Sequence, residues 1–329
     1  MASATFWKGA SDARLVASAS RQLIDAVTGG HHWAERYDRD LVDIFALQDD
    51  ITRSVAAAIE PRLIVAEGVR SFARSPADLG AWELVAQALA YFWRVTRTDH
   101  DTAVAVLTRA ARTYPDYAPA HSLLAFCWSF ASHMGWSERD QALSKSRSHS
   151  KRALQLDATD PWAHLALGYE AMMEGRIDPS IAAFRRAIEL NPNSAEAHSQ
   201  LGRALAFAGR DEEALAEAQL SIRLSPRGPQ LALFTAVIGL SHCVAGRYDD
   251  AITFLSEALK ARPEFQGAQR ALCVSLANAG RLQEAQKVLA LLIRQQPGLS
   301  IAWVKQNLPF PGTVMERYLD GLRKAGLPE

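Results

Sequence analysis

The sequence contains little cysteine. Only Cys127, Cys243 and Cys273 occur in 329 residues, and no two of them form a C-x-x-C pair. This spacing excludes a zinc knuckle and a thioredoxin-like motif. An odd number of thiols without a disulfide pattern is typical of a reducing compartment. We therefore expect buried free thiols in a cytoplasmic protein.

The sequence also lacks an excess of charge. Lys and Arg total 36, as do Asp and Glu, so the net charge is zero. A nucleic-acid surface needs a surplus of cations, so this balance disfavours a DNA-binding regulator. Long hydrophobic runs are missing too, because the most apolar stretch, residues 231–246, contains Ser241 and His242 and is shorter than a membrane span. The first 15 residues carry Lys8, Asp12 and Arg14, unlike a signal peptide.

Catalytic and cofactor motifs are not found either. The sequence has no G-x-S-x-G, no phosphate-binding G-x-x-x-x-G-K-[ST] and no G-x-G-x-x-G. His100, His133, His149 and His242 have no partner at a ligand spacing such as H-x-x-x-H. We therefore expect residues 79–329 to hold no catalytic constellation, no metal and no cofactor, and the chain not to be an enzyme.

What the sequence does contain is a repeat of fixed length. The pair Gly-Arg begins at Gly175, Gly209, Gly246 and Gly280, with spacings of 34, 37 and 34 residues. Prolines recur independently with the same three spacings, at Pro192, Pro226, Pro263 and Pro297. Two independent markers with the same spacings predict a stack of similar structural units of about 34 residues.

Each unit is predicted to be a helix–turn–helix pair. The glycine fits a left-handed cap after the first helix, and the proline ends the second helix. Five positions after each glycine stands a small residue: Ser180, Ala214, Ala251 or Ala285. Seven positions before each glycine stands Gly168, Gly202, Gly239 or Cys273. Small side chains at these positions predict close contacts between the two helices of a unit. Asp160-Pro161 and Asp178-Pro179 are each predicted to form an N-cap followed by proline in the first turn.

These positions, best seen in residues 163–192, resemble the tetratricopeptide repeat (TPR). Units starting near residues 161, 195, 232 and 266 match well, and two looser units span about 79–117 and 118–160, the second with an insertion at 135–141. The pattern stops after Pro297, and residues 314–328 predict an amphipathic capping helix. The expected fold is mainly α-helical, a TPR α-solenoid preceded by a short β-hairpin.

Three histidines, His121, His164 and His198, occupy the fourth position of successive units. That position of the repeat carries a large side chain that packs between helices. Histidines separated by whole repeats cannot converge on one ion in a stacked array, so we expect structural roles for them.

The resemblance also implies a concave groove, lined by positions 2, 5, 9, 12 and 13 of each first helix. In this sequence the proposed lining is apolar and aromatic with two cations: Tyr91, Phe92, Phe126, Phe130, Trp162, Tyr169, Met172, Met173, Arg203, Phe207 and Arg270. Such a surface suits an amphipathic helix or an extended apolar peptide of a protein partner. The alternative is a groove filled in cis, by the insertion at 135–141 or by the C-terminal helix.

The N-terminal part of the sequence does not have the repeat pattern. Residues 14–27 predict a strand, residues 28–30 a turn and residues 31–38 a return strand, whereas residues 41–76 have helical spacing with a kink or break at Pro61. The stretch GGHHWAERYDRD, residues 29–40, is the most chemically dense in the chain. Since adjacent residues of a regular strand point to opposite faces, His31 and His32 are not expected to bind one ion.

The stretch from Arg21 to Thr52, with the closing residues 308–329, resembles bacterial regulators in which the end of a TolB amino-terminal-like α/β domain precedes TPR units. That arrangement commonly follows a class III adenylate/guanylate cyclase domain and sometimes a winged-helix domain. About 13 residues leave no room for the first strands of the α/β module, and no metal-binding aspartate of a cyclase can be matched. The strand edges of the remaining half predict homodimerisation through residues 14–40.

The predicted division is therefore a β-hairpin remnant at 1–45, a connecting helix at 46–78, about six TPR units at 79–300 and a capping helix at 301–329. The favoured function is a non-catalytic scaffold that binds a protein or peptide partner, without nucleic acid or membrane. The alternative is a regulatory fragment of an adenylate/guanylate cyclase whose catalytic domain lies outside this chain.

Overall fold

The computed structural model describes residues 16–24, 31–40 and 79–329. Strands β1 (Val16–Ile24) and β2 (His31–Asp40) pair antiparallel, as predicted for residues 14–27 and 31–38. The predicted turn at 28–30 lies outside the described residues. The pairing shifts between Leu23 and Ile24, which oppose Trp33 and His31, so His32 has no opposite residue. This register shift is a departure from the regular strand assumed for His31 and His32. The predicted helix at 41–76 lies outside the described residues.

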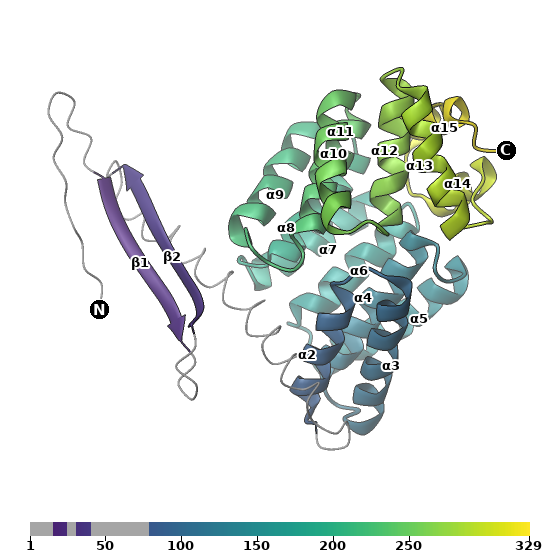
Figure 1. Ribbon diagram of the computed structural model, residues 1–329. Helices are drawn as coiled ribbons and strands as arrows, with labels where there is room; N and C mark the ends of the chain where they lie inside the picture. The colour runs from purple at the N-terminus through teal and green to yellow at the C-terminus, as the bar shows by residue number, and fades with distance from the viewer. Residues whose placement is uncertain (1–15, 25–30, 41–78) are drawn as a thin grey trace, which may run out of the picture.

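Residues 79–329 form six antiparallel helix pairs and two closing helices, stacked side by side (Figure 1). The pairs are α2 (Ala81–Phe92) with α3 (Arg97–Thr113), α4 (Ala118–Met134) with α5 (Arg139–Leu156), α6 (Pro161–Met173) with α7 (Ile177–Leu190), α8 (Ala195–Phe207) with α9 (Asp211–Leu224), α10 (Leu231–Val244) with α11 (Tyr248–Ala261), and α12 (Gln266–Asn278) with α13 (Leu282–Gln295). Helices α14 (Ile301–Asn307) and α15 (Gly312–Ala325) follow.

Repeating glycines make the turns within the pairs. Gly175, Gly209, Gly246 and Gly280 all have φ between 73° and 80°, a region that costs other residues energy because of their Cβ atoms. At the first of them, the Gly175 amide donates to the Met172 carbonyl and the Arg176 amide to the Ala171 carbonyl, both at 2.9 Å. These bonds satisfy the last carbonyls of α6, so the chain leaves each first helix in the same direction.

Small residues let the two helices of a pair approach closely. A Cβ added to Gly202 of α8 would lie 2.9 Å from the Ala214 carbonyl oxygen and 3.1 Å from the Ala218 amide nitrogen of α9. In the pair α12–α13, the Cys273 thiol instead approaches the Ala285 carbonyl at 3.5 Å. The predicted close contacts are therefore present.

Of the two N-caps predicted from the sequence, one is present in the structure and the other is not. Asp160 caps α6, and its Oδ1 accepts from the Trp162 amide at 2.9 Å. Asp178, in contrast, lies inside the first turn of α7, whose N-cap is Arg176, so the predicted Asp178 cap is wrong. An acidic side chain in a first turn still interacts favourably with the helix dipole.

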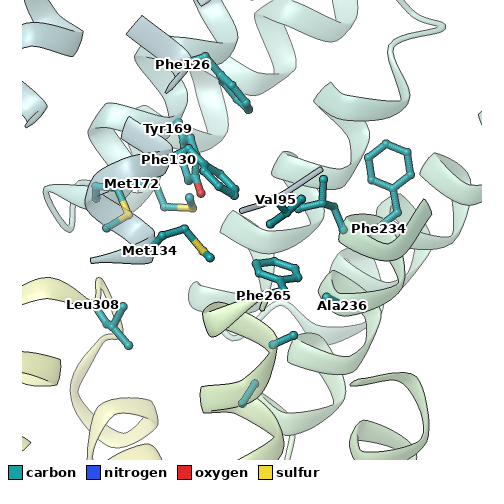
Figure 2. Packing of buried hydrophobic residues seen from close by; sticks show 14 of the residues in the cluster. Val95, Phe126, Phe130, Met134, Tyr169, Met172, Phe234, Ala236, Phe265 and Leu308 are labelled. Atoms are coloured by element: carbon teal, nitrogen blue, oxygen red, sulfur yellow. The ribbon is translucent and has the colours of Figure 1, made fainter. Parts of the chain in front are cut away.

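The array curves until its first and later pairs touch. Arg262, which follows α11, donates from Nε to the Trp93 carbonyl and from Nη2 to the Pro229 carbonyl, both at 3.2 Å. Val95, in the α2–α3 turn, has φ 58°, a strained value for a β-branched residue. It is buried in the same apolar cluster as Phe234 of α10 and Phe265 (Figure 2). Burial and the Arg262 contact together hold this turn in place.

The C-terminal helices close the other end. Helix α15 packs on α12 and α13 and buries Val314, Tyr318, Leu319 and Leu322. The Ile301 amide donates to the Pro328 carbonyl at 2.8 Å, which ties the start of α14 to the chain end. The predicted amphipathic helix at 314–328 is thus present. Within residues 79–329, no helix is both long enough and apolar enough to cross a membrane.

Candidate partner-binding groove

The first helices of the pairs are buried to an unusual extent. In a two-layer solenoid, one face of these helices is expected to line an open concave surface. Every residue of α8, from Ala195 to Phe207, is buried, including the polar side chains. Other parts of the chain therefore cover the concave face at α8.

Aromatic rings fill the end of the concave face near α2, α4 and α6. Phe92 meets Phe126 and Phe130 edge-on, with ring centroids 5.7 and 4.9 Å apart. Phe126 also contacts Trp162 at 5.5 Å and Tyr169 at 5.4 Å. Figure 2 shows Phe126, Phe130 and Tyr169 close together, with Met134 and Met172 beside them. Apart from Trp162, which is partly exposed, the members of this cluster are nearly inaccessible to solvent, so it is a packed core.

The C-terminal segment covers the middle of the concave face. Phe310, between α14 and α15, packs edge-on against Phe207 of α8, with ring centroids 4.8 Å apart. Its other neighbour is Tyr318 of α15, at 4.5 Å. Leu308 has an extended backbone, with ψ 137°, and is also buried. An extended apolar segment of this chain thus occupies the surface predicted to bind a partner.

Two arginines lie buried beneath this segment. Arg203 of α8 is 2% exposed and donates from Nη1 to the Tyr169 hydroxyl at 3.0 Å. Arg270 of α12 is 1% exposed and donates from Nη2 to the His133 carbonyl at 2.8 Å. Arg270 also lies over the Trp303 ring, 5.4 Å from its centroid. Both side chains line a small cavity with Phe207, Phe310 and Tyr318.

The predicted groove residues are therefore together in space but mostly not accessible. Nine of the eleven are buried: Phe92, Phe126, Phe130, Tyr169, Met172, Met173, Arg203, Phe207 and Arg270. Only Tyr91 and Trp162 are partly exposed. Their burial does not fit an open groove and agrees with the alternative filled in cis. The insertion contributes Trp136, whose ring centroid lies 5.7 Å from that of Phe130, and the C-terminal segment contributes Phe310, which packs on Phe207.

The repeated histidines have structural partners. His121, His164 and His198 each bond through Nε2 to the carbonyl six residues earlier, of Pro115, Ala158 and Pro192, at 3.1 Å in all three cases. Gln269 makes the same contact with Pro263 at 2.7 Å in a later unit. The fourth position thus ties each first helix to the preceding turn. The described residues include no group of three or more side chains placed to hold a metal.

The cysteines are buried and free, as the sequence predicts. Burial raises the pKa of Cys243 to about 11 and that of Cys273 to about 12, and it raises the pKa of Cys127 further. A thiol with a raised pKa carries little thiolate at neutral pH and is a poor nucleophile. These side chains pack as small apolar groups.

The sequence reasoning missed the side chains that cover the groove. Leu308 and Phe310 stand in the short stretch LPFP, where the repeat pattern has already ended. Two prolines around a phenylalanine signal an extended segment, because proline cannot continue a helix. That signal indicates an extended apolar segment but does not reveal which surface it packs against.

Two stretches of the chain, residues 165–229 and residues 245–304, match models described as tetratricopeptide repeat. A curated relative named "Putative adenylate cyclase 3", from Rhizobium meliloti (strain 1021), is 32% identical over 159 residues. That match covers 48% of this chain and 27% of the relative, so the chain spans about a quarter of the relative's length.

Solved structures with very different sequences share the fold. The human IFIT1 dimer with m7Gppp-AAAA has a TM-score of 0.54 at 13% identity, covering 65% of this chain and 50% of that one. The APC/C hetero-tetramer Cut9-Hcn1 has a TM-score of 0.53 at 16% identity, covering 79% and 46%. With the helix pairs and the two matched stretches, these likenesses show that the helical part of the chain is a tetratricopeptide-repeat α-solenoid.

Proposed function

We propose that this chain is a non-catalytic scaffold that binds a protein partner on the concave face of its solenoid. The fold points to protein–protein interaction, and the eleven groove residues define the proposed surface. The partner supplies an extended apolar segment with an aromatic side chain. It binds where residues 308–318 lie in this structure and therefore competes with them.

The observation that supports this proposal is the contact between Phe310 and Phe207. The concave face receives a phenylalanine from an extended, proline-flanked segment and covers it to 9% exposure. A surface that accommodates such a segment in cis has the shape and the apolar character to accept one in trans. The chain's own segment is a tethered competitor and therefore acts at a high effective concentration. A partner needs a higher affinity or a higher concentration to displace it.

The test uses the chain's own segment as the probe. A fluorescein-labelled peptide of residues 305–313, KQNLPFPGT, is titrated against the Phe310→Ala variant of the full chain and against the unmodified chain. We expect the variant to bind the peptide and the unmodified chain to bind it about tenfold more weakly or not at all. The control peptide, with alanine in place of phenylalanine, is expected not to bind.

Circular dichroism establishes that the variant retains its helices before the titration. A folded Phe310→Ala variant that does not bind the peptide would contradict the proposed surface. Equal binding of the phenylalanine and alanine peptides would contradict the role given to the aromatic side chain.

A second candidate comes from the relative named as an adenylate cyclase, which is 32% identical to part of this chain. On that basis the chain is a regulatory segment in cyclic-nucleotide signalling rather than the catalytic part. Incubation with ATP or GTP and Mg²⁺ or Mn²⁺ is expected to give no cyclic nucleotide. Product formation that scales with the concentration of the pure chain would show an enzyme and contradict both candidates.

A further inference from the structure

Two buried guanidinium groups share one cavity without a carboxylate partner. Arg203 and Arg270 both line the cavity under Phe310, and each is at least 98% buried. Neither takes part in any ion pair within residues 79–329. Arginine stays protonated in proteins, and an isolated buried charge is costly. A negative charge in this cavity would therefore stabilise the two buried arginines.

Hydrogen-bond donors around the cavity are also unused. Nε of Arg203 and Nη1 of Arg270 are buried and have no hydrogen-bond acceptor among the described residues. Nδ1 of His133, from α4, has no partner either. Burial lowers the pKa of His133 well below its ordinary value, and the charges of Arg203 and Arg270 lower it further, so this ring is neutral. Three unpaired nitrogen atoms on residues that line one cavity are unusual, because buried polar groups are nearly always bonded.

The acidic side chain that interacts with Arg203 does not balance the charge of the two arginines. Glu196 interacts electrostatically with Arg203 but is not paired with it, and its carboxyl accepts from Gln200 at 2.8 Å. Burial raises the pKa of Glu196. The electrostatic partners of Arg270 are the phenols Tyr318 and Tyr169, which are neutral at physiological pH. Even an ionised Glu196 would leave one positive charge in excess.

The cavity limits the size of the anion that can bind between the two arginines. The space open to the centre of a water-sized sphere is about 20 Å³, and one water molecule needs about 10–15 Å³ on that measure. Gly267 helps to create this space, since a Cβ there would lie 3.0 Å from Nε2 of His133. This space is the size of a monatomic ion rather than of a nucleotide or a peptide side chain.

We propose that Arg203 and Arg270 bind a single halide ion, chloride in a cell, in this cavity. The ion accepts hydrogen bonds from Nε of Arg203 and Nη1 of Arg270 and neutralises their excess charge. It thereby links α8 and α12 beneath Phe310 and Tyr318. Chloride is thus an integral counterion of the closed solenoid, independent of which partner the groove binds.

Bromide locates the site directly in the unmodified protein. Crystals grown or soaked in sodium bromide are expected to show an anomalous scattering peak between the Arg203 and Arg270 guanidiniums. Well-diffracting crystals without a peak there would overturn the proposal.

Thermal unfolding tests the same site in solution. At constant ionic strength, replacing gluconate by chloride is expected to raise Tm in proportion to the logarithm of chloride concentration, because the ion binds only the folded state. Arg203→Met and Arg270→Met are each expected to abolish this rise. The control Arg185→Met, at an exposed arginine of α7, is expected to keep it. An unchanged Tm, or a rise with acetate but not with chloride, would overturn the assignment, and the bromide experiment remains decisive if a variant does not fold.

Discussion

Phe310 and Phe207 meet edge to face, with ring centroids 4.8 Å apart and an angle of 79° between their planes. Phe207 ends helix α8 in the middle of the array, and Phe310 belongs to the segment that leads into α15. Edge-to-face aromatic pairs contribute about 0.5–1.5 kcal/mol beyond the burial of their area. This one contact joins the repeat array to its C-terminal segment across the concave face.

Replacing Gly202 with alanine is expected to destabilise the fold by about 1–2 kcal/mol. The new Cβ would press against the Ala214 carbonyl and the Ala218 amide of the partner helix, and overpacking of this kind costs about 1–3 kcal/mol. The better helix propensity of alanine offsets part of that cost. Urea unfolding measures the change.

The matched control for this substitution is Gly298→Ala. No atom lies within 4 Å of a Cβ added at Gly298, and its φ is not in the left-handed region. We expect a change within about 0.5 kcal/mol. Equal effects at the two glycines would show that the close approach of α8 and α9 is not the cause.

The histidine pair His121 and His149 predicts a loss of stability in mild acid. Their Nδ1 atoms lie 3.2 Å apart. Burial first, and then the charges of His121 and Lys145, lower the pKa of His149 to about 4, and burial also lowers the pKa of His121. Between pH 6.5 and pH 4 the unfolded chain therefore binds protons that the folded chain does not, so stability falls as the pH falls.

Urea midpoints at pH 7 and pH 5 measure this effect. His149→Gln is expected to reduce the difference between the two midpoints, because one proton-binding group of the unfolded state is removed. A residual difference is expected from His100 and His133, whose pKa values burial also lowers. A variant with the same pH dependence as the unmodified chain would contradict the role of this pair.

The turns and the fold class could be predicted because they depend on local requirements. A glycine such as Gly175 is needed wherever φ is near +77°, and this need recurs with the repeat. The start of α7 at Ile177 rather than at Pro179 could not be predicted, since either residue can begin a helix. The connecting helix at 46–78 and the link to a TolB-like domain remain predictions.

Sequence reasoning named both an open groove and a groove filled in cis, and it could not decide between the two. Residues such as Tyr169 and Phe207 are typical both of a binding surface and of a core. Phe207 belongs to the core because Phe310, in the segment from Leu308 to Tyr318, packs on it, and no periodicity relates that segment to α8. Arg203 and Arg270 are buried and line a cavity together with Phe310 and Tyr318 of that segment.

The three thiols are expected to be inert in the folded protein. Cys127, Cys243 and Cys273 are buried, and burial raises each pKa, so neither access nor thiolate is available. Ellman's reagent at pH 8 should therefore release no colour until urea is added, when three thiols should react. Rapid reaction of one thiol in the native protein would show that its helix pair opens readily.

The N-terminal hairpin is predicted to mediate dimerisation through residues 14–40. In the described part of the chain β1 and β2 form a two-stranded sheet, and each strand keeps an edge that no other described strand pairs. Open edges favour pairing with a second copy. Light scattering across a concentration series is expected to show a dimer, and Ala19→Pro, which removes a backbone donor from β1, should weaken it. A monomer at the highest concentration would contradict this prediction.

The most direct test of the covered groove is a double-mutant cycle between Phe207 and Phe310. Each alanine substitution alone is expected to cost about 3 kcal/mol, the lower end for a buried phenylalanine, whereas Leu291→Ala, at a side chain 45% exposed, should cost under about 0.5 kcal/mol. If the two rings touch in solution, the double variant should lose less than the sum, with a coupling of about 1 kcal/mol. Losses that add to within about 0.3 kcal/mol would show that the C-terminal segment does not occupy the concave face.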